Sequence, residues 1–421
     1  MITLLIIADD FTGALDTGVK FAQKGTNVQV VTDCGYDFSQ AKKELQVLVM
    51  DTETRHIDEQ EAYKKVFDIV NRAKEAGIPY IYKKTDSGLR GNIGSELTAV
   101  LDAAGDSILH FVPALPKMNR VTKQGVHYID GVPVSESVFG RDPFDPVLKS
   151  EISEIIRMQS KAWVQIVTDS SILTKAERPT IAVYDAETEE RVKKIAHKLY
   201  ESKQLSALAG CAGLAEYLPE ILNLTGEKPG KPQFDPGLLI ACGSINPITM
   251  NQLDYAENHG FHRIHLTLDE KLVPGFFETD PGKERITKIV SQIKETPFCI
   301  LDSHDVSESE ETMTRAESMG IASEEVRMRI ASSFGSLLKE LLKDEIMNTL
   351  LITGGDTLMG FLQKIGVNEM TPIYEMEPGV VLSIVQIHGK NYNIISKSGG
   401  FGDEDLMEKL TEKIMNGVKD K

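Results

Sequence analysis

The chain has 421 residues, more than one ordinary hydrophobic core accommodates and enough for two α/β domains. Hydrophobic residues make up 41% and charged residues 26% of it, as in typical globular proteins. The formal net charge of −17 argues against nucleic acid and membranes as partners, because an acidic surface repels phosphate groups.

Short apolar runs alternate with longer amphipathic stretches in the first half of the chain. The predicted strands are 2–8, 28–32, 46–50, 80–84, 108–112, 163–167, 181–184 and 205–209, and the predicted helices are 14–24, 58–76, 93–104 and 189–202. This alternation is typical of βαβ units, so we expect a mostly parallel, doubly wound sheet with flanking helices. Trp163 falls in an apolar strand pattern and is expected in the core.

The sequence shows no pattern typical of a secreted or membrane protein. The first apolar run is too short for a signal peptide, and no run of eighteen apolar residues occurs. The four cysteines are far apart, which favours reduced thiols over a disulfide framework or a zinc site. We therefore expect a cytoplasmic protein.

Residues 113–148 interrupt the alternation with five prolines and little periodicity. A long loop of this kind is usually functional or part of an interface, such as that of a homodimer; the alternative is a surface excursion without a role. Several polar side chains in it can reach a cleft, although for the histidine a structural role is the commoner case. They are His127, Tyr128, Asp130, Arg141, Asp142 and Asp145.

The pattern changes around residues 225–237, where residues 225–232 hold two glycines, two prolines and two lysines without an apolar period, which indicates a linker. We accordingly divide the chain into domains 1–228 and 229–421. In the second domain the predicted strands are 237–241, 263–267, 298–301, 349–353, 381–387 and 392–395, and the predicted helices are 247–259, 283–295, 324–343, 356–365 and 403–416. A second α/β sheet is expected there.

Two groups of chemistry-bearing residues follow predicted strands in the first domain. Asp9 and Asp10 end the first strand before a Thr-Gly turn, at the sheet edge where α/β proteins bind ligands. They can hydrogen-bond ligand hydroxyls or accept a proton, whereas the structural alternative is that one caps the next helix. The second group is Lys84, Asp86, Ser87 and Arg90, whose cations and helix start suit a carboxylate or phosphate.

Arg55 follows the third predicted strand and can add a second arginine to the same edge. An arginine there is also often a solvated surface charge, and both readings stay open.

Three glycine-bearing turns follow strands of the second domain. Glycines let a backbone approach phosphate closely, and the next helix points its free N–H groups at it. These turns favour a nucleotide site in which Ser244 and Thr357 donate hydroxyl hydrogen bonds and Asp356 contacts Mg²⁺ through water. Their residues are Gly243 and Ser244, then Gly354, Gly355, Asp356 and Thr357, then Gly399 and Gly400. The patterns of P-loop, dinucleotide-binding, zinc-protease and hydrolase sites do not occur.

The order and the residues of these motifs resemble those of the four-carbon acid sugar kinase family, over almost the whole chain. The resemblance is carried by Ala8-Asp9-Asp10-Phe11-Thr12-Gly13-Ala14, Lys84-Thr85-Asp86-Ser87 with Arg90-Gly91, Gly354-Gly355-Asp356-Thr357 and Lys397-Ser398-Gly399-Gly400-Phe401-Gly402. It implies an acid-sugar-binding first domain, a nucleotide-binding second domain, and transfer of the γ-phosphoryl of ATP to the terminal hydroxyl of the acid. By motif, Asp10, Arg55 and Lys84 to Arg90 would bind substrate, whereas Ser244, Gly354 to Thr357 and Gly400 would bind ATP.

The first two motifs are more similar to the D-threonate and D-erythronate branch, with a 3-oxo-tetronate kinase as the alternative. Gly88 departs from the family pattern, in which a small hydroxyl residue is expected. We expect in-line phosphoryl transfer with Mg²⁺ in a cleft. Arg90, together with Arg55 or Lys84, would hold the substrate carboxylate, and Asp9, Asp10 or Asp86 would act as the base. A hydroxy-acid dehydrogenase or isomerase and a non-catalytic sensor of acid sugar and nucleotide are the rival functions.

Overall fold

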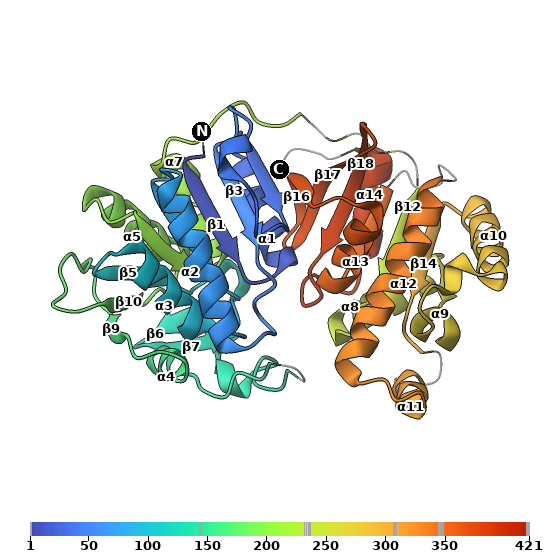
Figure 1. Cartoon of the computed structure of the whole chain (residues 1–421), viewed down its shortest axis with the longest axis horizontal. Coiled ribbons are helices and arrows are strands. Elements are labelled where there is room, and N and C mark those ends of the chain that lie inside the picture. Colours follow the sequence, from blue (N-terminus) through green and yellow to red (C-terminus); the bar gives the residue numbers. More distant parts are fainter. Residues whose placement is uncertain are drawn as a thin grey trace. The chain divides into compact units, whose positions relative to one another are not determined.

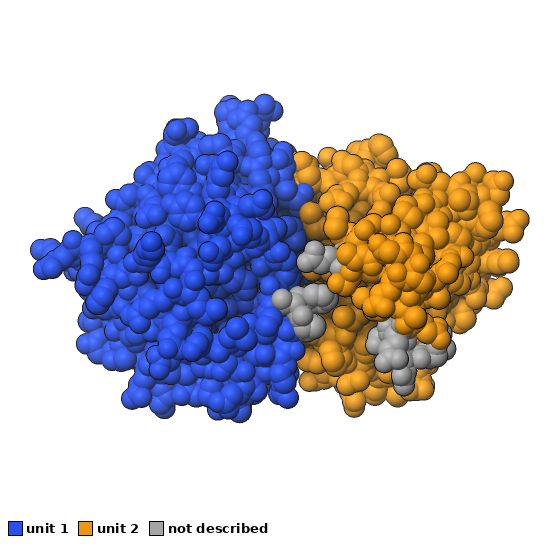
Figure 2. Space-filling model, turned by 60° about the horizontal axis from the view of Figure 1, so that its bottom comes forward, with its two compact units in different colours: residues 1–228 blue, residues 229–421 orange. Residues whose placement is uncertain are grey.

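The computed structural model describes residues 2–142, 145–230, 232, 234, 237–305, 310–343 and 349–417, and for Glu310 and Glu324 the backbone alone. The chain forms two compact units, Met1–Lys228 (unit 1) and Pro229–Lys421 (unit 2), shown in separate colours in Figure 2. Part of the linker expected near 225–237 and residues Pro143 and Phe144 of the proline-rich loop lie outside the described residues.

Unit 1 is a parallel sheet with helices on both faces (Figure 1). In chain order its elements are β1 (Leu4–Ala8), α1 (Phe11–Ala22), β2 (Val28–Val31), η1 (Phe38–Gln40), β3 (Val47–Asp51), α2 (Glu59–Glu75), β4 (Tyr80–Lys84), α3 (Ile93–Ala104), β5 (Ile108–Val112), η2 (Pro116–Met118), β6 (Arg120–Lys123), β7 (Val126–Ile129), β8 (Val132–Pro133), η3 (Val134–Glu136), α4 (Ile152–Arg157), β9 (Trp163–Val167), β10 (Thr180–Tyr184), α5 (Glu189–Glu201), β11 (Ala207–Gly210), α6 (Ala212–Ala215) and α7 (Leu218–Ile221), where η marks a 3-10 helix.

The strand order of unit 1 is β2-β3-β1-β4-β11-β5-β10-β9, and each neighbouring pair is parallel. Helices α2 and α3 pack together on one face, while α1, α6 and α7 pack together on the other. The central strands β1 and β3 are buried along their whole length and almost entirely apolar, because helices cover both faces of the sheet. The chain leaves β1 toward β3 and later returns on its other side to β4, so the switch point of the sheet lies at β1 and β4.

The proline-rich segment is more ordered than its composition suggests. It contains the small antiparallel sheet β6-β7-β8, whose turn residues Gln124, Gly125, Asp130 and Gly131 have positive φ. Its strands are short and mixed in polarity, so no periodic signal marks them. The expectation for Trp163 was wrong: on the edge strand β9 its side chain is 45% exposed, and the Arg178 guanidinium stacks 3.7 Å from the ring centroid.

Unit 2 is a second α/β sheet, with an antiparallel extension. Its elements are β12 (Leu238–Cys242), α8 (Pro247–Asn258), β13 (His262–His265), α9 (Leu268–Leu272), η4 (Phe276–Glu278), α10 (Asp280–Glu295), β14 (Phe298–Asp302), α11 (Glu310–Ser318), α12 (Ser323–Lys343), β15 (Thr349–Thr353), α13 (Gly355–Ile365), β16 (Glu369–Glu377), β17 (Val380–Ile387), β18 (Lys390–Lys397) and α14 (Leu406–Asn416).

The strand order in unit 2 is β13-β14-β12-β15-β18-β17-β16. The first five strands pair in parallel, whereas β17 pairs antiparallel with β18 and with β16. Helix α12 packs on α13, and α8 packs on α14. The switch point lies at β12 and β15, by the same reasoning as in unit 1. The prediction of two mostly parallel α/β sheets is therefore confirmed.

Candidate active site

In unit 1 the sequence motifs converge because three parallel strands end at one edge. Ala8 at the end of β1 is in register with Asp51 of β3 and with Lys84 of β4. The segments that follow these strands carry Asp9 and Asp10, then Arg55, then Asp86 to Arg90. They therefore meet at the switch point of the sheet, where α/β folds bind ligands.

Arg55 is the centre of this cluster. Its Nε donates to Asp9 Oδ2 at 2.8 Å and its Nη2 to Asp10 Oδ1 at 2.6 Å, while Nη2 lies 3.7 Å from Asp86 Oδ1. The Arg55 side chain is buried, so the alternative of a solvated surface charge is excluded. A buried arginine among three carboxylates fixes the orientation of all three.

Lys83 and Lys84 are adjacent on β4 and have different environments, because successive strand residues point to opposite faces. Lys83 is fully buried and pairs with Glu96 of α3 at 3.0 Å (Nζ–Oε2). The ammonium of Lys84 lies 3.9 Å from Asp9 Oδ1, too far for a hydrogen bond. No hydrogen-bond partner for the oxygen Asp9 Oδ1 exists among the described residues.

Asp86 and Arg90, four residues apart in the turn between β4 and α3, form a bidentate ion pair. Arg90 donates from Nε to Asp86 Oδ2 at 2.8 Å and from Nη2 to Oδ1 at 3.1 Å. Its Nη1 donates to Asp142 of the proline-rich segment at 3.0 Å. The guanidinium is 5.0 Å from the centroid of the Phe139 ring, and Arg120 contacts the same ring at the same distance.

Gly88 is required by the position of Phe139. A Cβ atom on Gly88 would lie 2.6 Å from Phe139 Cδ1, closer than real contacts allow. The departure from the hydroxyl residue expected at this position thus makes room for the aromatic ring that supports Arg90.

Ser87 is held by the small sheet β6-β7-β8. Its hydroxyl accepts a hydrogen bond from Arg120, and its carbonyl oxygen lies 2.9 Å from His127 Nε2. His127 is fully buried, and burial lowers the pKa of its imidazole to about 4. His127 therefore supports the Asp86–Arg90 turn, which is the structural role named above as the commoner case for a histidine.

Asp10 and Asp86 are ionised at neutral pH. Burial raises the pKa of Asp10, but Arg55 and Lys84 outweigh it and hold the pKa at about 2. Burial acts likewise on Asp86, where the charges of Arg90 and Arg55 keep the pKa well below its usual range. Asp10 is the most accessible of the three carboxylates, with 18% of its side chain exposed. Its Oδ2 also accepts a hydrogen bond from Thr12 Oγ1 at 2.6 Å.

Sequence reasoning missed Arg120 and Phe139, and left Asp142 as one of several polar candidates. No local pattern marks Arg120 or Phe139, since they reach the site from the insertion after β5. An arginine and an aromatic residue within a proline-rich insertion are the only signal.

In unit 2, three turns converge for the same topological reason. Cys242 of β12 is in register with Thr353 of β15, which is in register with Lys397 of β18. Each strand is followed by a glycine turn and then a helix, namely α8, α13 and α14. Helix α8 begins at Pro247, and the Asn246 side chain caps it by accepting from Ile248 N at 3.0 Å.

The turns of unit 2 are in contact through their smallest residues. A Cβ atom on Gly243 would lie 2.1 Å from Thr357 Oγ1, so the buried Thr357 side chain packs directly over this glycine. Gly354, the N-cap of α13, has φ of +103°, which only glycine adopts readily. The Cβ position of Gly399 lies 3.1 Å from Ser244 Oγ.

The other predicted residues lie at the rim of the same edge. Gly355 and Asp356 begin α13, and the Asp356 carboxylate lies 3.4 Å from Arg327 Nε of α12 (Oδ2–Nε). Gly400 is exposed. The predicted nucleotide residues of the three turns therefore belong to one convergence of three loops, while the predicted substrate residues belong to the convergence in unit 1.

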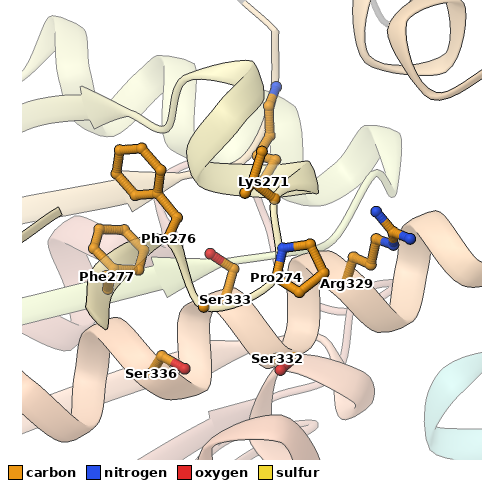
Figure 3. Close-up of a pocket in the computed structure, with 10 residues that line it drawn as sticks. Lys271, Pro274, Phe276, Phe277, Arg329, Ser332, Ser333 and Ser336 are labelled. Atoms are coloured by element: carbon orange, nitrogen blue, oxygen red, sulfur yellow. The ribbon is translucent and has the colours of Figure 1, made fainter. Parts of the chain in front are cut away.

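A separate small cavity of about 50 Å³ lies in unit 2 between η4 and α12 (Figure 3). Phe276 and Phe277 line one side, and Ser332, Ser333 and Ser336 of α12 line another. It contains none of the predicted nucleotide residues and has room for about one or two water molecules, far less than a nucleotide needs.

Within the described parts of the chain, no group of three His, Cys, Asp or Glu side chains is placed to hold a metal ion. None of the described helices is both long enough and apolar enough to cross a membrane.

Comparison with family models matches both units. A model described as a sugar-binding N-terminal domain matches residues 4–218, and one described as a nucleotide-binding C-terminal domain matches residues 239–407.

Relatives align along nearly their whole length. A D-threonate kinase from Salmonella typhimurium is 28% identical, with 96% of each chain aligned. A D-erythronate kinase from Heliobacterium modesticaldum is 27% identical, with 99% of each chain aligned. A 3-oxo-tetronate kinase from Haemophilus influenzae is 24% identical, over 96% of this chain and 98% of the relative.

Two solved structures share the fold. One from Salmonella typhimurium LT2 has a TM-score of 0.77 at 20% identity, covering 97% of this chain and 99% of that one. A Haemophilus influenzae protein of family DUF1537 has a TM-score of 0.70 at 19% identity, covering 97% of this chain and all of that one.

Proposed function

The chain belongs to the four-carbon acid sugar kinase family, in which a sugar-binding N-terminal domain precedes a nucleotide-binding C-terminal domain, and we propose that it transfers the γ-phosphoryl group of ATP to a four-carbon acid sugar. The observation that carries the proposal is the placement of its motifs: each unit gathers them at the switch point of its own sheet. Unit 1 brings Arg55, Lys84 and Arg90 to this edge, where they can bind an acid, and unit 2 has glycine turns that suit phosphates.

The substrate carboxylate binds the cations of unit 1. Arg90 is the most accessible of them, with 25% of its side chain exposed, and Asp86 and Phe139 fix its guanidinium. Lys84 is available because it has no hydrogen-bonded partner among the described residues. Arg55, Asp86 and Ser87 orient the groups that contact the acid.

Asp10 is the proton acceptor for the attacking hydroxyl. It is ionised, accessible and oriented by Arg55 and Thr12. Asp9 and Asp86 are more deeply buried against arginines, so they position these cations. A carboxylate with a low pKa is a weak base. It suffices where the hydroxyl loses its proton late in a loose phosphoryl transfer.

The nucleotide binds unit 2 at Ser244, Gly354 to Thr357, Gly399 and Gly400. These turns fit a phosphate chain because their glycines leave space where side chains would project, and because α8, α13 and α14 begin there. Mg²⁺ would neutralise charge on the phosphates, and Asp356 would hold it through water.

The acid is D-threonate or D-erythronate, and the product is its 4-phosphate. The relatives bearing those names are 28% and 27% identical, against 24% for a 3-oxo-tetronate kinase. The motif likeness to the threonate and erythronate branch points the same way.

The test is ADP production by purified protein with Mg²⁺ and ATP, against both enantiomers of threonate and erythronate and against 3-oxo-tetronates. We expect turnover with D-threonate or D-erythronate and a singly phosphorylated product by mass spectrometry. Phosphorylation of a 3-oxo-tetronate alone would replace the branch assignment. ATP binding without turnover on any acid would replace the kinase with a sensor.

A further inference from the structure

Lys397, the last residue of β18, is a buried cation without a counter-charge among the residues that the structure describes. Its side chain is fully buried, as are those of Lys83 and Lys271. Lys83 pairs with Glu96, and Lys271 pairs with Asp305. No carboxylate of the described residues lies within ion-pair distance of Lys397. A buried charge is costly unless it is paired, so an unpaired one calls for a reason.

The hydrogen bonds of Lys397 all go to neutral oxygens around one predicted nucleotide turn. Its Nζ donates to Thr249 Oγ1 at 3.0 Å, to Ser398 O at 3.1 Å and to Gly399 O at 3.3 Å. Thr249 Oγ1 in turn donates to Gly399 O at 2.9 Å. Lys397 thus draws two carbonyl oxygens of the turn inward beneath the glycines.

The same turn carries two backbone amides that are not hydrogen-bonded to any described residue. Among the described residues, the backbone N–H groups of Gly399 and Gly400 have no hydrogen-bond acceptor. Unpaired amides above a buried cation form an anion site, since both the dipoles and the charge favour negative groups. The surrounding protein is acidic, with a net charge of −17, so local positive charge is needed to hold a polyphosphate.

We propose that Lys397 is the buried cation of the nucleotide site: it holds the Ser398–Gly400 turn in shape, and its charge is balanced only when the phosphate chain of a nucleotide binds that turn. Lys397 acts through the turn and is therefore a positioning residue. The inference rests on the proposed function, because it assumes that unit 2 takes a nucleotide.

The charge state of Lys397 gives the inference a measurable signature. Burial lowers the pKa of Lys397 to about 8 in the free protein. A bound polyphosphate favours the charged form and raises this pKa. Above pH 8, binding must therefore take up a proton, and the affinity for ATP falls as pH rises.

The other titratable groups around Lys397 give no competing signature. β15 and β17, its neighbours in the sheet, carry none, and the buried Cys242 thiol on β12 has a raised pKa. The remaining groups on packed elements lie in contacts of their own. They are Asp302 on β14, Asp254 and Glu257 on α8, which pair with Arg263, and Tyr255 on α8 with Glu408 on α14.

The first experiment uses the unmodified protein, with binding of ATP, ADP and adenosine measured from about pH 7.5 to 9.5 at constant ionic strength. The range starts above the titration of the terminal phosphate. We expect ATP affinity to fall above about pH 8 by up to tenfold per pH unit, and adenosine affinity to stay constant. A pH-independent ATP affinity, or an equal fall for adenosine, would overturn the inference.

The second experiment compares Lys397→Met with Lys271→Met, a matched loss of a buried lysine in the same unit. Lys397→Met should weaken ATP binding by about tenfold or more, change adenosine binding by less than about twofold, and abolish the pH dependence. Lys271→Met should lower stability and leave the pH profile intact. A Lys397→Met protein that retains the wild-type pH profile would contradict the proposal; if it does not fold, the wild-type titration decides.

The two proposals fail differently. Turnover with an ATP affinity that ignores pH would overturn the role of Lys397 alone. Absence of nucleotide binding at every pH would overturn both.

Discussion

Arg55 and Asp10 are 45 residues apart in the chain, yet Arg55 Nη2 donates to Asp10 Oδ1 at 2.6 Å. The same guanidinium holds Asp9 through Nε, so one side chain orients two consecutive carboxylates. A planar fork can do this and a lysine ammonium cannot. The geometry of the proposed base therefore depends on an arginine from a different βα turn.

Arg55→Lys should consequently reduce kcat by about 100-fold, because a point charge cannot fix both aspartates. We expect it also to lower the free energy of unfolding by about 3 kcal/mol, since three buried carboxylates lose their shared partner. Steady-state kinetics and urea unfolding measure the two effects. Arg72→Lys is the control: within the described parts of the chain, Arg72 donates to the backbone oxygens of Tyr36 and Cys34 and to no carboxylate, so kcat should not change. Equal kcat values for both variants would argue against the role of Arg55.

Asp10→Asn should lower kcat by about 10²- to 10⁴-fold with a small change in KM for the acid, because the amide keeps the shape but accepts no proton. Asp86→Asn should chiefly raise KM, since it releases Arg90 from its bidentate ion pair. Initial rates over a matrix of acid and ATP concentrations separate the effects. Near-normal kcat in Asp10→Asn would show that another group takes the proton.

Acid should destabilise the protein through the same aspartate. The folded pKa of Asp10, about 2, is below its unfolded value of about 3.9. Its contribution is therefore fully present above about pH 4 and is lost as pH falls toward 2, with a size on the order of 2 kcal/mol. Urea unfolding of wild type and Asp10→Asn between pH 5 and 3 tests this, because other groups titrate in both. The stability difference should shrink as pH falls, and a constant difference would be inconsistent with the depressed pKa.

Gly88→Ser should raise KM for the acid, because its Cβ would lie 2.6 Å from the Phe139 ring that supports Arg90. Phe139→Leu should also raise KM, by about two- to fivefold, through loss of the cation–π contact. If steric displacement of Phe139 is the cause, the double variant should be no worse than the worse single variant. Strictly additive effects on KM would mean that residue 88 acts by another route.

The sheets were readable from the sequence because each strand is a short apolar run followed by an amphipathic helix. β4, β5, β9 and β15 have the residues expected, and α3 has both expected ends. β16 was missed because Pro372 and its charged residues obscure a strand that also contains register shifts. Trp163 was misplaced because an apolar pattern does not distinguish a central strand from an edge strand.

For the candidate site, the sequence predicted which turns are involved but not the contacts between their side chains. Asp9, Asp10 and Asp86 were all plausible bases, and only their unequal burial beside Arg55 and Arg90 separates them. Lys397 was noticed as part of a motif, but the absence of a nearby carboxylate is a property of the fold. The use of Mg²⁺ and the homodimer stay predictions.

The insertion β6-β7-β8 would allow acid recognition to change separately from the proposed catalytic residues. Arg120 and His127 in this insertion, with Asp142 just beyond it, reach Ser87 and Arg90, whereas Asp10 and Arg55 belong to the parallel sheet. Mutations in the insertion are therefore expected to change acid recognition while leaving the proposed base, Asp10, in place. Exchanging this segment with the corresponding one of a relative would test whether it determines the choice of acid.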